Sequence, residues 1–113
     1  LQQIYEKFEL EKQFLADYTS TNKIVRVYIQ KMLTRLYAAD DPTQIDATHN
    51  SKINSLGLPI YHMETADGYR LYYAYSKTSA KPIHILCHCI KSKEAVYFNK
   101  MKNSETFKKK FRN

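Results

Sequence analysis

The sequence predicts an α+β domain in which an N-terminal strand and an antiparallel helix hairpin pack on an antiparallel sheet. Three observations support this fold class: two successive helical repeats near the N-terminus, three short strand-like runs after them, and a length of 113 residues. A chain of this length forms one hydrophobic core, so we expect a single domain over residues 1–113.

The first part of the chain predicts one short strand followed by two helices. Residues 2–10 alternate imperfectly between apolar and charged side chains, which favours a strand. Residues 10–20 and 22–40 instead repeat apolar side chains at spacings of three and four, as amphipathic helices do. Ser20, Thr21 and Asn22 are each suitable N-caps for the second helix. So short a turn predicts an antiparallel hairpin whose apolar side requires a sheet.

A polar connection over residues 40–55 separates this hairpin from three strand-like runs. Asp41 and Pro42 end the helical region, because the residue before a proline disfavours helix. The runs cover residues 58–65, 69–76 and 82–90, and the short turns between them predict an antiparallel meander.

The segment after Ile90 predicts further helix within a basic C-terminal region. Ala95, Phe98 and Met101 have helical spacing, and Ser104 is a suitable cap for a last turn that contains Phe107 and Phe111. Residues 1–80 contain nine Lys/Arg and nine Asp/Glu, whereas residues 81–113 carry the whole net charge of +7. Such a surface suits nucleic acid, an acidic protein or anionic lipid, or it is a solvated surface that aids solubility.

The short apolar runs, together with two cysteines that are poorly placed to bridge each other on one predicted strand, indicate a cytosolic protein. The apolar run over residues 83–87 is too short to span a bilayer, and residues 1–10 lack a secretory signal pattern. Cys87 and Cys89 alternate with His84 and His88 along one predicted strand, which splits the potential metal ligands between two faces. We therefore expect no metal site, and we expect both cysteines to lie in the core beneath the helix hairpin, with the histidines on the opposite face.

The order strand, helix, helix, meander and basic tail resembles the RelE/ParE superfamily of bacterial toxin-antitoxin toxins. Residues 53–77, "INSLGLPIYHMETADGYRLYYAYSK", are similar to the family's Leu/Gly element, aromatic strand, turn and Tyr-Arg-Leu-x-Tyr strand. Residues 84–98, "HILCHCIKSKEAVYF", resemble its apolar strand followed by basic residues and a Val-Tyr pair. The resemblance implies a toxin that cleaves mRNA on the ribosome without metal or organic cofactor, by attack of the RNA 2′-hydroxyl.

The resemblance also implies roles for individual residues. Arg70 matches a family arginine that binds phosphate and stabilises the transition state; the alternative is a strand arginine that covers the sheet or pairs with Asp67 or Glu64. Lys91 and Lys93 fall where ribonuclease members carry basic residues, and both point to one side if the strand continues. Tyr97 matches a tyrosine that stacks on a base or orients the nucleotide, although a tyrosine beside Phe98 is also typical of packing.

The strand over residues 58–65 departs from the family pattern, because it offers His62 and Glu64 where more positive charge is expected. Either residue could replace the missing base, or the chain cleaves weakly or not at all. His88, close to Lys91, is a secondary candidate. The alternatives are a non-catalytic ParE-like toxin that binds gyrase and a basic nucleic-acid-binding module. The resemblance further implies a partner, an acidic and partly disordered antitoxin, and no membrane association.

Overall fold

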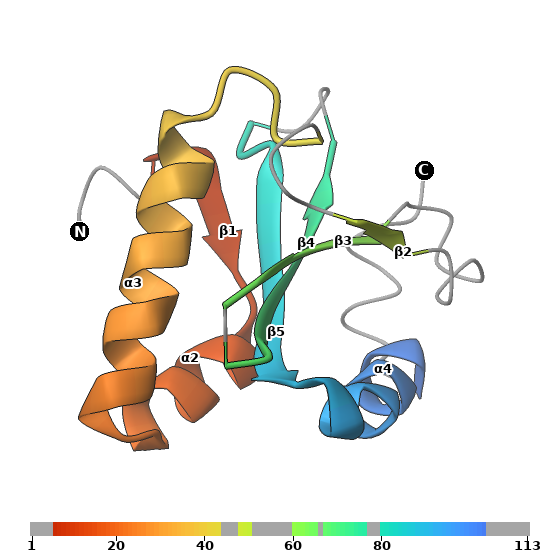
Figure 1. The fold of residues 1–113 in the computed structure, drawn as a ribbon. Helices are drawn as coiled ribbons and strands as arrows, with labels where there is room; N and C mark the ends of the chain where they lie inside the picture. Colours follow the sequence, from red (N-terminus) through yellow and green to blue (C-terminus); the bar gives the residue numbers. More distant parts are fainter. Residues whose placement is uncertain (1–5, 44–47, 51–59, 66, 77–79, 104–113) are drawn as a thin grey trace.

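A computed structural model describes residues 6–43, 48–50, 60–65, 67–76 and 80–103 (Figure 1). The described elements are two helices after a first strand, then four strands, and a short 3₁₀ turn that leads into a last helix. In chain order they are β1 (Phe8–Leu10), α2 (Lys12–Ser20), α3 (Lys23–Ala38), β2 (Thr48–Asn50), β3 (Ile60–Glu64), β4 (Tyr69–Tyr75), β5 (Ile83–Ile90), η2 (Lys91–Lys93) and α4 (Glu94–Asn103). The fold class is α+β, as the sequence predicts.

The described strands form one mixed sheet in the order β1-β5-β4-β3-β2. Strands β2 to β5 pair antiparallel, which confirms the meander. The prediction of a wholly antiparallel sheet is wrong, because β1 pairs parallel to β5, with Phe8 opposite Ile83. A parallel pair requires a long crossover, which the intervening helices and strands supply. Strand β2 is also unexpected, since the sequence predicts only a connection there.

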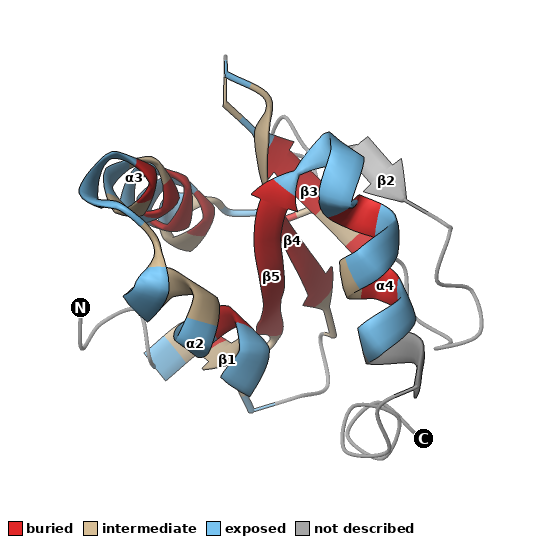
Figure 2. Cartoon of the chain, turned by 90° about the horizontal axis from the view of Figure 1, so that it is seen from below, coloured by how far each residue is buried: buried red, intermediate tan, exposed pale blue. Residues whose placement is uncertain are grey.

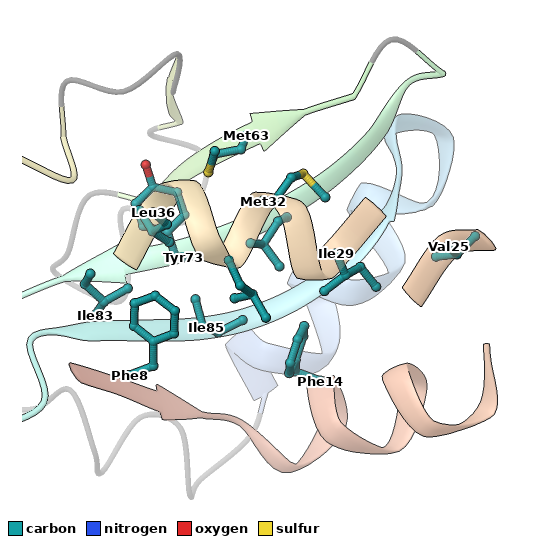
Figure 3. Packing of buried hydrophobic residues seen from close by; sticks show 12 residues of the cluster. Phe8, Phe14, Val25, Ile29, Met32, Leu36, Met63, Tyr73, Ile83 and Ile85 are labelled. Atoms are coloured by element: carbon teal, nitrogen blue, oxygen red, sulfur yellow. The ribbon is translucent and has the colours of Figure 1, made fainter. Parts of the chain in front are cut away.

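Helices α2 and α3 cover one face of the sheet, and α4 covers the other (Figure 2). Of the three predicted caps, Asn22 is the N-cap of α3, and its side chain accepts a hydrogen bond of 2.9 Å from the amide of Val25. The apolar stripe of α3 turns inward, and Figure 3 shows Ile29 and Leu36 above the strands. Phe8, Ile29, Leu36, Leu71, Tyr73, Ile83 and Ile85 are fully buried in this first core.

A β-bulge in β5 changes which side chains face the helices. Tyr72 pairs with Cys87 but Tyr73 pairs with Ile85, so Leu86 has no partner across the ladder. Alternation therefore reverses at this residue: Ile83 and Ile85 belong to the core under α2 and α3, whereas Leu86, Cys87 and Cys89 belong to a second core on the opposite face. The expectation that the cysteines lie beneath the helix hairpin is wrong, since a regular strand was assumed.

The second core lies between the sheet and α4. It contains Ile60, Tyr72, Ala74, Leu86, Cys87, Cys89 and Phe98, with Tyr97 partly buried beside it. Phe98 contacts Tyr72 edge to face, with ring centroids 5.0 Å apart. Glu94 is buried and Ala95 is exposed, so the inner face of α4 differs from the predicted one by about a third of a turn. The predicted cap at Ser104 and the turn with Phe107 and Phe111 lie outside the described residues.

Candidate functional site

Charged and polar side chains from β3, β4 and α4 meet at one buried cluster, which we call the Arg70 network. It consists of His62, Glu64, Arg70, Tyr72 and Glu94. The Arg70 guanidinium pairs with Glu94 Oε2 at 3.1 Å and, through Nε, with Glu64 Oε1 at 3.4 Å. The Tyr72 hydroxyl donates a hydrogen bond of 2.5 Å to the same Glu94 oxygen.

The pairing of β3 with β4 brings these residues together. Glu64 lies opposite Arg70 and His62 lies opposite Tyr72, so the four side chains point to the α4 face. Glu94 enters from the first turn of α4, where a carboxylate is favoured by the helix dipole. Burial, followed by the Glu94 carboxylate, raises the pKa of Tyr72 well above its ordinary value. Burial and then the Arg70 charge lower the pKa of His62.

Arg70 is therefore occupied by carboxylates of its own chain. Its side chain is only 12% exposed, and Glu94 is 5% exposed as a residue. The alternative interpretation of Arg70, a strand arginine paired with Glu64, agrees with this geometry. Sequence reasoning missed Glu94, because its inward orientation depends on how α4 docks. The sequence feature that pointed to Glu94 is an acidic residue at the start of a helix that follows a buried strand.

A cleft opens where the ends of β5, α2 and α4 approach one another. We call it the α2–α4 cleft, and its volume is about 590 Å³. Residues from all three elements and from β4 and η2 line it: Asp17, Ser20, Thr21, Tyr69, His88, Cys89, Ile90, Lys93, Val96, Tyr97 and Lys100. In Figure 1 the end of β5 lies between α2 and α4. The cleft thus lies at the end of β5, between α2 on one face of the sheet and α4 on the other.

His88 is one of the buried titratable groups of this cleft. The bulge turns it toward α2, so its ring contacts Phe14 edge to face at 5.7 Å and stacks on Tyr69 at 5.9 Å between centroids. The prediction that His88 shares a face with Leu86, opposite the main core, is therefore wrong. His88 lies beside Asp17, whose backbone also acts on the pKa of the imidazole, and the Asp17 side chain forms a hydrogen bond with Tyr97. Burial lowers the pKa of His88, and the nearby Asp17 carboxylate partly opposes this shift.

Cations and an aromatic ring lie on the α4 side of the cleft. Burial, and then the charge of Asp17, raise the pKa of Tyr97 to about 12, so the phenol stays protonated near neutral pH. The ammonium of Lys100 lies 5.9 Å from the centroid of the Tyr97 ring. Lys93 and Lys100 are both exposed. The cleft therefore combines two accessible cations with the rings of Tyr69 and Tyr97.

Six of the seven predicted site residues divide between two places, and Lys91 belongs to neither. His88, Lys93 and Tyr97 meet in the α2–α4 cleft, whereas His62, Glu64 and Arg70 belong to the Arg70 network. The condition under which Lys91 and Lys93 would point to one side is not met, because the strand ends at Ile90 and both lie in the η2 turn. Lys91 is exposed and does not line the cleft; its charge contributes to the lowered pKa of His62.

Sequence reasoning missed three residues of the cleft: Asp17, Tyr69 and Lys100. Asp17 lies on α2, far in the sequence from His88, Lys93 and Tyr97, and no local pattern connects it with them. Lys100 was detectable, because it follows Lys93 by two helical turns and Tyr97 by three residues.

Neither a metal site nor a membrane span is found in the part of the chain that the structure describes. No three His, Cys, Asp or Glu side chains gather there in a way that could hold a metal ion. No helix among the same residues is long and apolar enough to cross a membrane. The chain matches no protein-family model, no curated protein and no solved structure.

Proposed function

We propose that the chain is a RelE-like toxin of a toxin-antitoxin system, an endoribonuclease that cleaves mRNA on the ribosome, and that the α2–α4 cleft is its site. The observation that carries this proposal is the convergence of His88, Lys93 and Tyr97 from a strand, a turn and a helix. The resemblance to the RelE/ParE superfamily selects Lys93 and Tyr97, and His88 is the secondary candidate from the sequence. Lys100 and Asp17 complete the arrangement.

The chemistry of the cleft suits a single RNA strand. Lys93 and Lys100 supply charge for one phosphate, and the net charge of +7 favours an anionic partner. Tyr69 and Tyr97 present ring faces on which an unstacked base can lie. The walls are formed in part by Val96 and Ile90, which lower the local dielectric and strengthen these interactions.

His88 and Tyr97 fit the two proton transfers of RNA cleavage. With a lowered pKa, His88 is neutral near pH 7 and accepts the proton of the 2′-hydroxyl as that oxygen attacks the phosphorus. The bond to the 5′-oxygen then breaks, and the Tyr97 phenol supplies a proton to the leaving oxygen. Lys93 and Lys100 offset the charge that develops on the phosphorane. Asp17 faces His88 and stabilises the imidazolium that forms.

This proposal gives Arg70 a supporting role. Binding a phosphate through Arg70 requires the guanidinium to leave Glu94, which would then be a buried carboxylate without its cation. We infer instead that the Arg70 network holds α4 against the sheet, and so holds Lys93 and Tyr97 at the cleft. Glu64 pairs with Arg70 in that network, and His62 lies beside them, so we assign both residues to the same supporting role.

The ion pairing of Arg70 favours a second candidate, a non-catalytic ParE-like toxin that binds gyrase. If Arg70 is the essential phosphate ligand in ribonuclease members, its occupation by two carboxylates disfavours cleavage. This candidate predicts supercoiling defects and DNA damage with intact mRNA. In either case we propose an acidic, partly disordered antitoxin as the partner of the basic surface and the cytoplasm as the place of action.

The experiment that tests the proposal is brief expression in bacteria with mapping of new 5′ ends across cellular mRNA. The informative variant is His88→Gln, which keeps a polar side chain of similar size but cannot act as the base at neutral pH. Breaks within translated regions that disappear in His88→Gln support the cleft as the site. Intact transcripts during growth arrest favour gyrase, and unchanged cleavage by His88→Gln contradicts the role of His88.

A further inference from the structure

The outward side of α3 is a surface that neither the α2–α4 cleft nor the Arg70 network uses. In Figure 2 the inner side of α3 is buried against the sheet and its outer side is exposed. A shallow groove of about 540 Å³ runs along this side, lined by Val27, Gln30, Lys31, Thr34 and Arg35. We call the exposed side the α3 face, and it consists of Lys23, Ile24, Val27, Gln30, Lys31, Thr34 and Arg35.

Two large apolar side chains are exposed one helical turn apart on the α3 face. Ile24 is 66% exposed and Val27 is 39% exposed. Residues three positions apart are neighbours on a helix surface, so these two side chains form one apolar strip. Covering the strip with apolar groups of a partner is favourable, because both surfaces then leave water. The α3 face therefore offers a small anchor point for a protein surface.

The charged residues of α3 are all cations. The helix contains no Asp or Glu, and its basic residues are Lys23, Arg26, Lys31 and Arg35. Lys23 lies in the first turn, where the helix dipole favours an acidic residue instead. Lys31 and Arg35 place like charges four residues apart, which also disfavours the helix. Departures of this kind from the rules of helix stability are expected at functional surfaces, and an anionic partner relieves both.

The combination of apolar and basic side chains distinguishes between kinds of partner. The phosphates of a nucleic acid pair with lysines but leave Ile24 and Val27 exposed. A second copy of the chain, docked through the same face, opposes cations with cations. A membrane surface requires a broad apolar face, whereas α3 buries most of its apolar residues in the core. An acidic helix with an apolar stripe matches both kinds of side chain.

We propose that the α3 face docks an acidic amphipathic helix of a partner protein. Apolar residues of that helix, three and four positions apart, pack on Ile24 and Val27. Its Asp and Glu side chains pair with Lys23 and Lys31 at the rim, where ion pairs contribute mainly to specificity and to the rate of association. The α3 face shares no described residue with the lining of the α2–α4 cleft. The inference therefore rests neither on RNA cleavage nor on an antitoxin.

The test measures binding of a fluorescein-labelled synthetic peptide to the purified native chain by fluorescence anisotropy. The peptide is a helix of about 18 residues, or about five turns, with Leu along one face and Glu on the others. A control peptide has the same composition in a shuffled order without the apolar stripe. We expect saturable binding of the first peptide and binding of the second that is weaker by about 10-fold or more. No saturable binding at about 1 mM peptide, or equal binding of both peptides, would overturn the proposal.

Two matched double variants locate the binding site of the peptide. Ile24→Ser with Val27→Ser removes the apolar strip of the α3 face, whereas Ile90→Ser with Val96→Ser removes exposed apolar side chains of the cleft. The first should weaken peptide binding by about 10-fold or more, because a few apolar anchors carry most of the binding energy. The second should leave binding unchanged. The opposite pattern would place the peptide at the cleft and overturn the assignment to α3.

A charge variant and two further measurements separate the other occupants of this face. Lys23→Gln with Lys31→Gln should weaken peptide binding and reduce its dependence on salt, whereas Lys12→Gln with Lys91→Gln removes the same charge elsewhere and should have little effect.

Binding of a single-stranded RNA that is lost in Lys23→Gln with Lys31→Gln but kept in Ile24→Ser with Val27→Ser would make the α3 face a nucleic-acid surface and overturn the proposal. A dimer in sedimentation that dissociates in Ile24→Ser with Val27→Ser would identify a second copy as the occupant, with the same consequence.

Discussion

The Arg70 network and the α2–α4 cleft contain the same kinds of side chain, but the cation of the network is buried in ion pairs and the cations of the cleft are exposed. In the network each charge has a partner: Arg70 bonds to Glu94 and Glu64, and Tyr72 completes the coordination of Glu94. In the cleft, Lys93 and Lys100 are exposed. The first arrangement consists of buried ion pairs within the chain, and the second leaves its cations at the surface.

This difference assigns a distinct role to each region. Buried charges that satisfy one another add little affinity for a ligand, because binding must first break the pairs that they form. Exposed cations such as Lys93 and Lys100 have no buried ion pair to break, so a ligand binds them without this cost. The contacts of an arginine in the folded chain therefore indicate its role better than its match to a family motif does. Substitutions in the network should change stability, and substitutions in the cleft should change activity or RNA binding.

The largest expected effect is that of Arg70→Ala on stability. The substitution leaves the buried Glu94 carboxylate without its cation, which should lower the free energy of unfolding by about 3 kcal/mol or more. Urea unfolding monitored by circular dichroism measures this change.

The matched control for Arg70→Ala is the double variant Arg70→Met with Glu94→Gln, which removes both charges. It should recover a large part of the lost stability, because no buried charge is left unpaired. Full stability in Arg70→Ala would mean that the network does not hold α4, and Arg70 would again be available for phosphate.

Most elements of the fold could be predicted from the sequence because their patterns are local. The strong periodicity of residues 22–40 became α3 at Lys23–Ala38, and the apolar run of residues 82–90 became β5 at Ile83–Ile90. The parallel pairing of β1 could not be predicted, since strand order is not encoded in alternation. Strand β2, with the polar sequence Thr-His-Asn, is recognisable only through its pairing with β3.

The candidate site was harder to predict, and the bulge at Leu86 is the main reason. A shift of one residue reverses the face of every later side chain in a strand. The bulge therefore moved His88 toward α2 and the two cysteines toward α4, contrary to regular alternation. The inner face of α4 was likewise not predictable from its own segment, because Glu94 faces inward to a partner, Arg70, that lies on another strand. Register and docking are tertiary properties that one segment does not determine.

The next effect in size concerns activity at the cleft. His88→Gln should lower the rate of RNA cleavage by about 10²–10⁴-fold, because a general base typically contributes that much. Cleavage of a labelled RNA in a translation reaction measures the rate. His62→Gln is the matched control, as it replaces a buried strand histidine of the Arg70 network; an equal loss in both variants would contradict a specific role for His88.

A smaller effect is expected from the cations at the rim of the cleft. The double variant Lys93→Ala with Lys100→Ala should weaken RNA binding and reduce the slope of log affinity against log salt by about 1.4, for two lost phosphate contacts on a single strand. Fluorescence anisotropy at several salt concentrations gives the slope. Lys12→Ala with Lys31→Ala removes the same charge from exposed positions on α2 and α3, and should leave the slope nearly unchanged.

The smallest expected effect is a pH dependence of stability that both regions share. The pKa values of His62 and His88 are lowered in the folded chain, chiefly by burial, whereas in the unfolded chain they return to about 6.5. Below about pH 6.5 the unfolded chain therefore binds protons that the folded chain does not, and stability falls as the pH decreases toward the folded pKa values. Above that pH both states are neutral at these residues and their contribution is constant. Urea unfolding between about pH 5 and pH 7 should give a positive slope of stability with pH, and His88→Leu and His62→Leu should each reduce it.

Because the two histidines lie in separate regions, the reductions in slope from the two variants should be additive. A double variant that loses no more slope than either single variant would show that the cleft and the network are coupled.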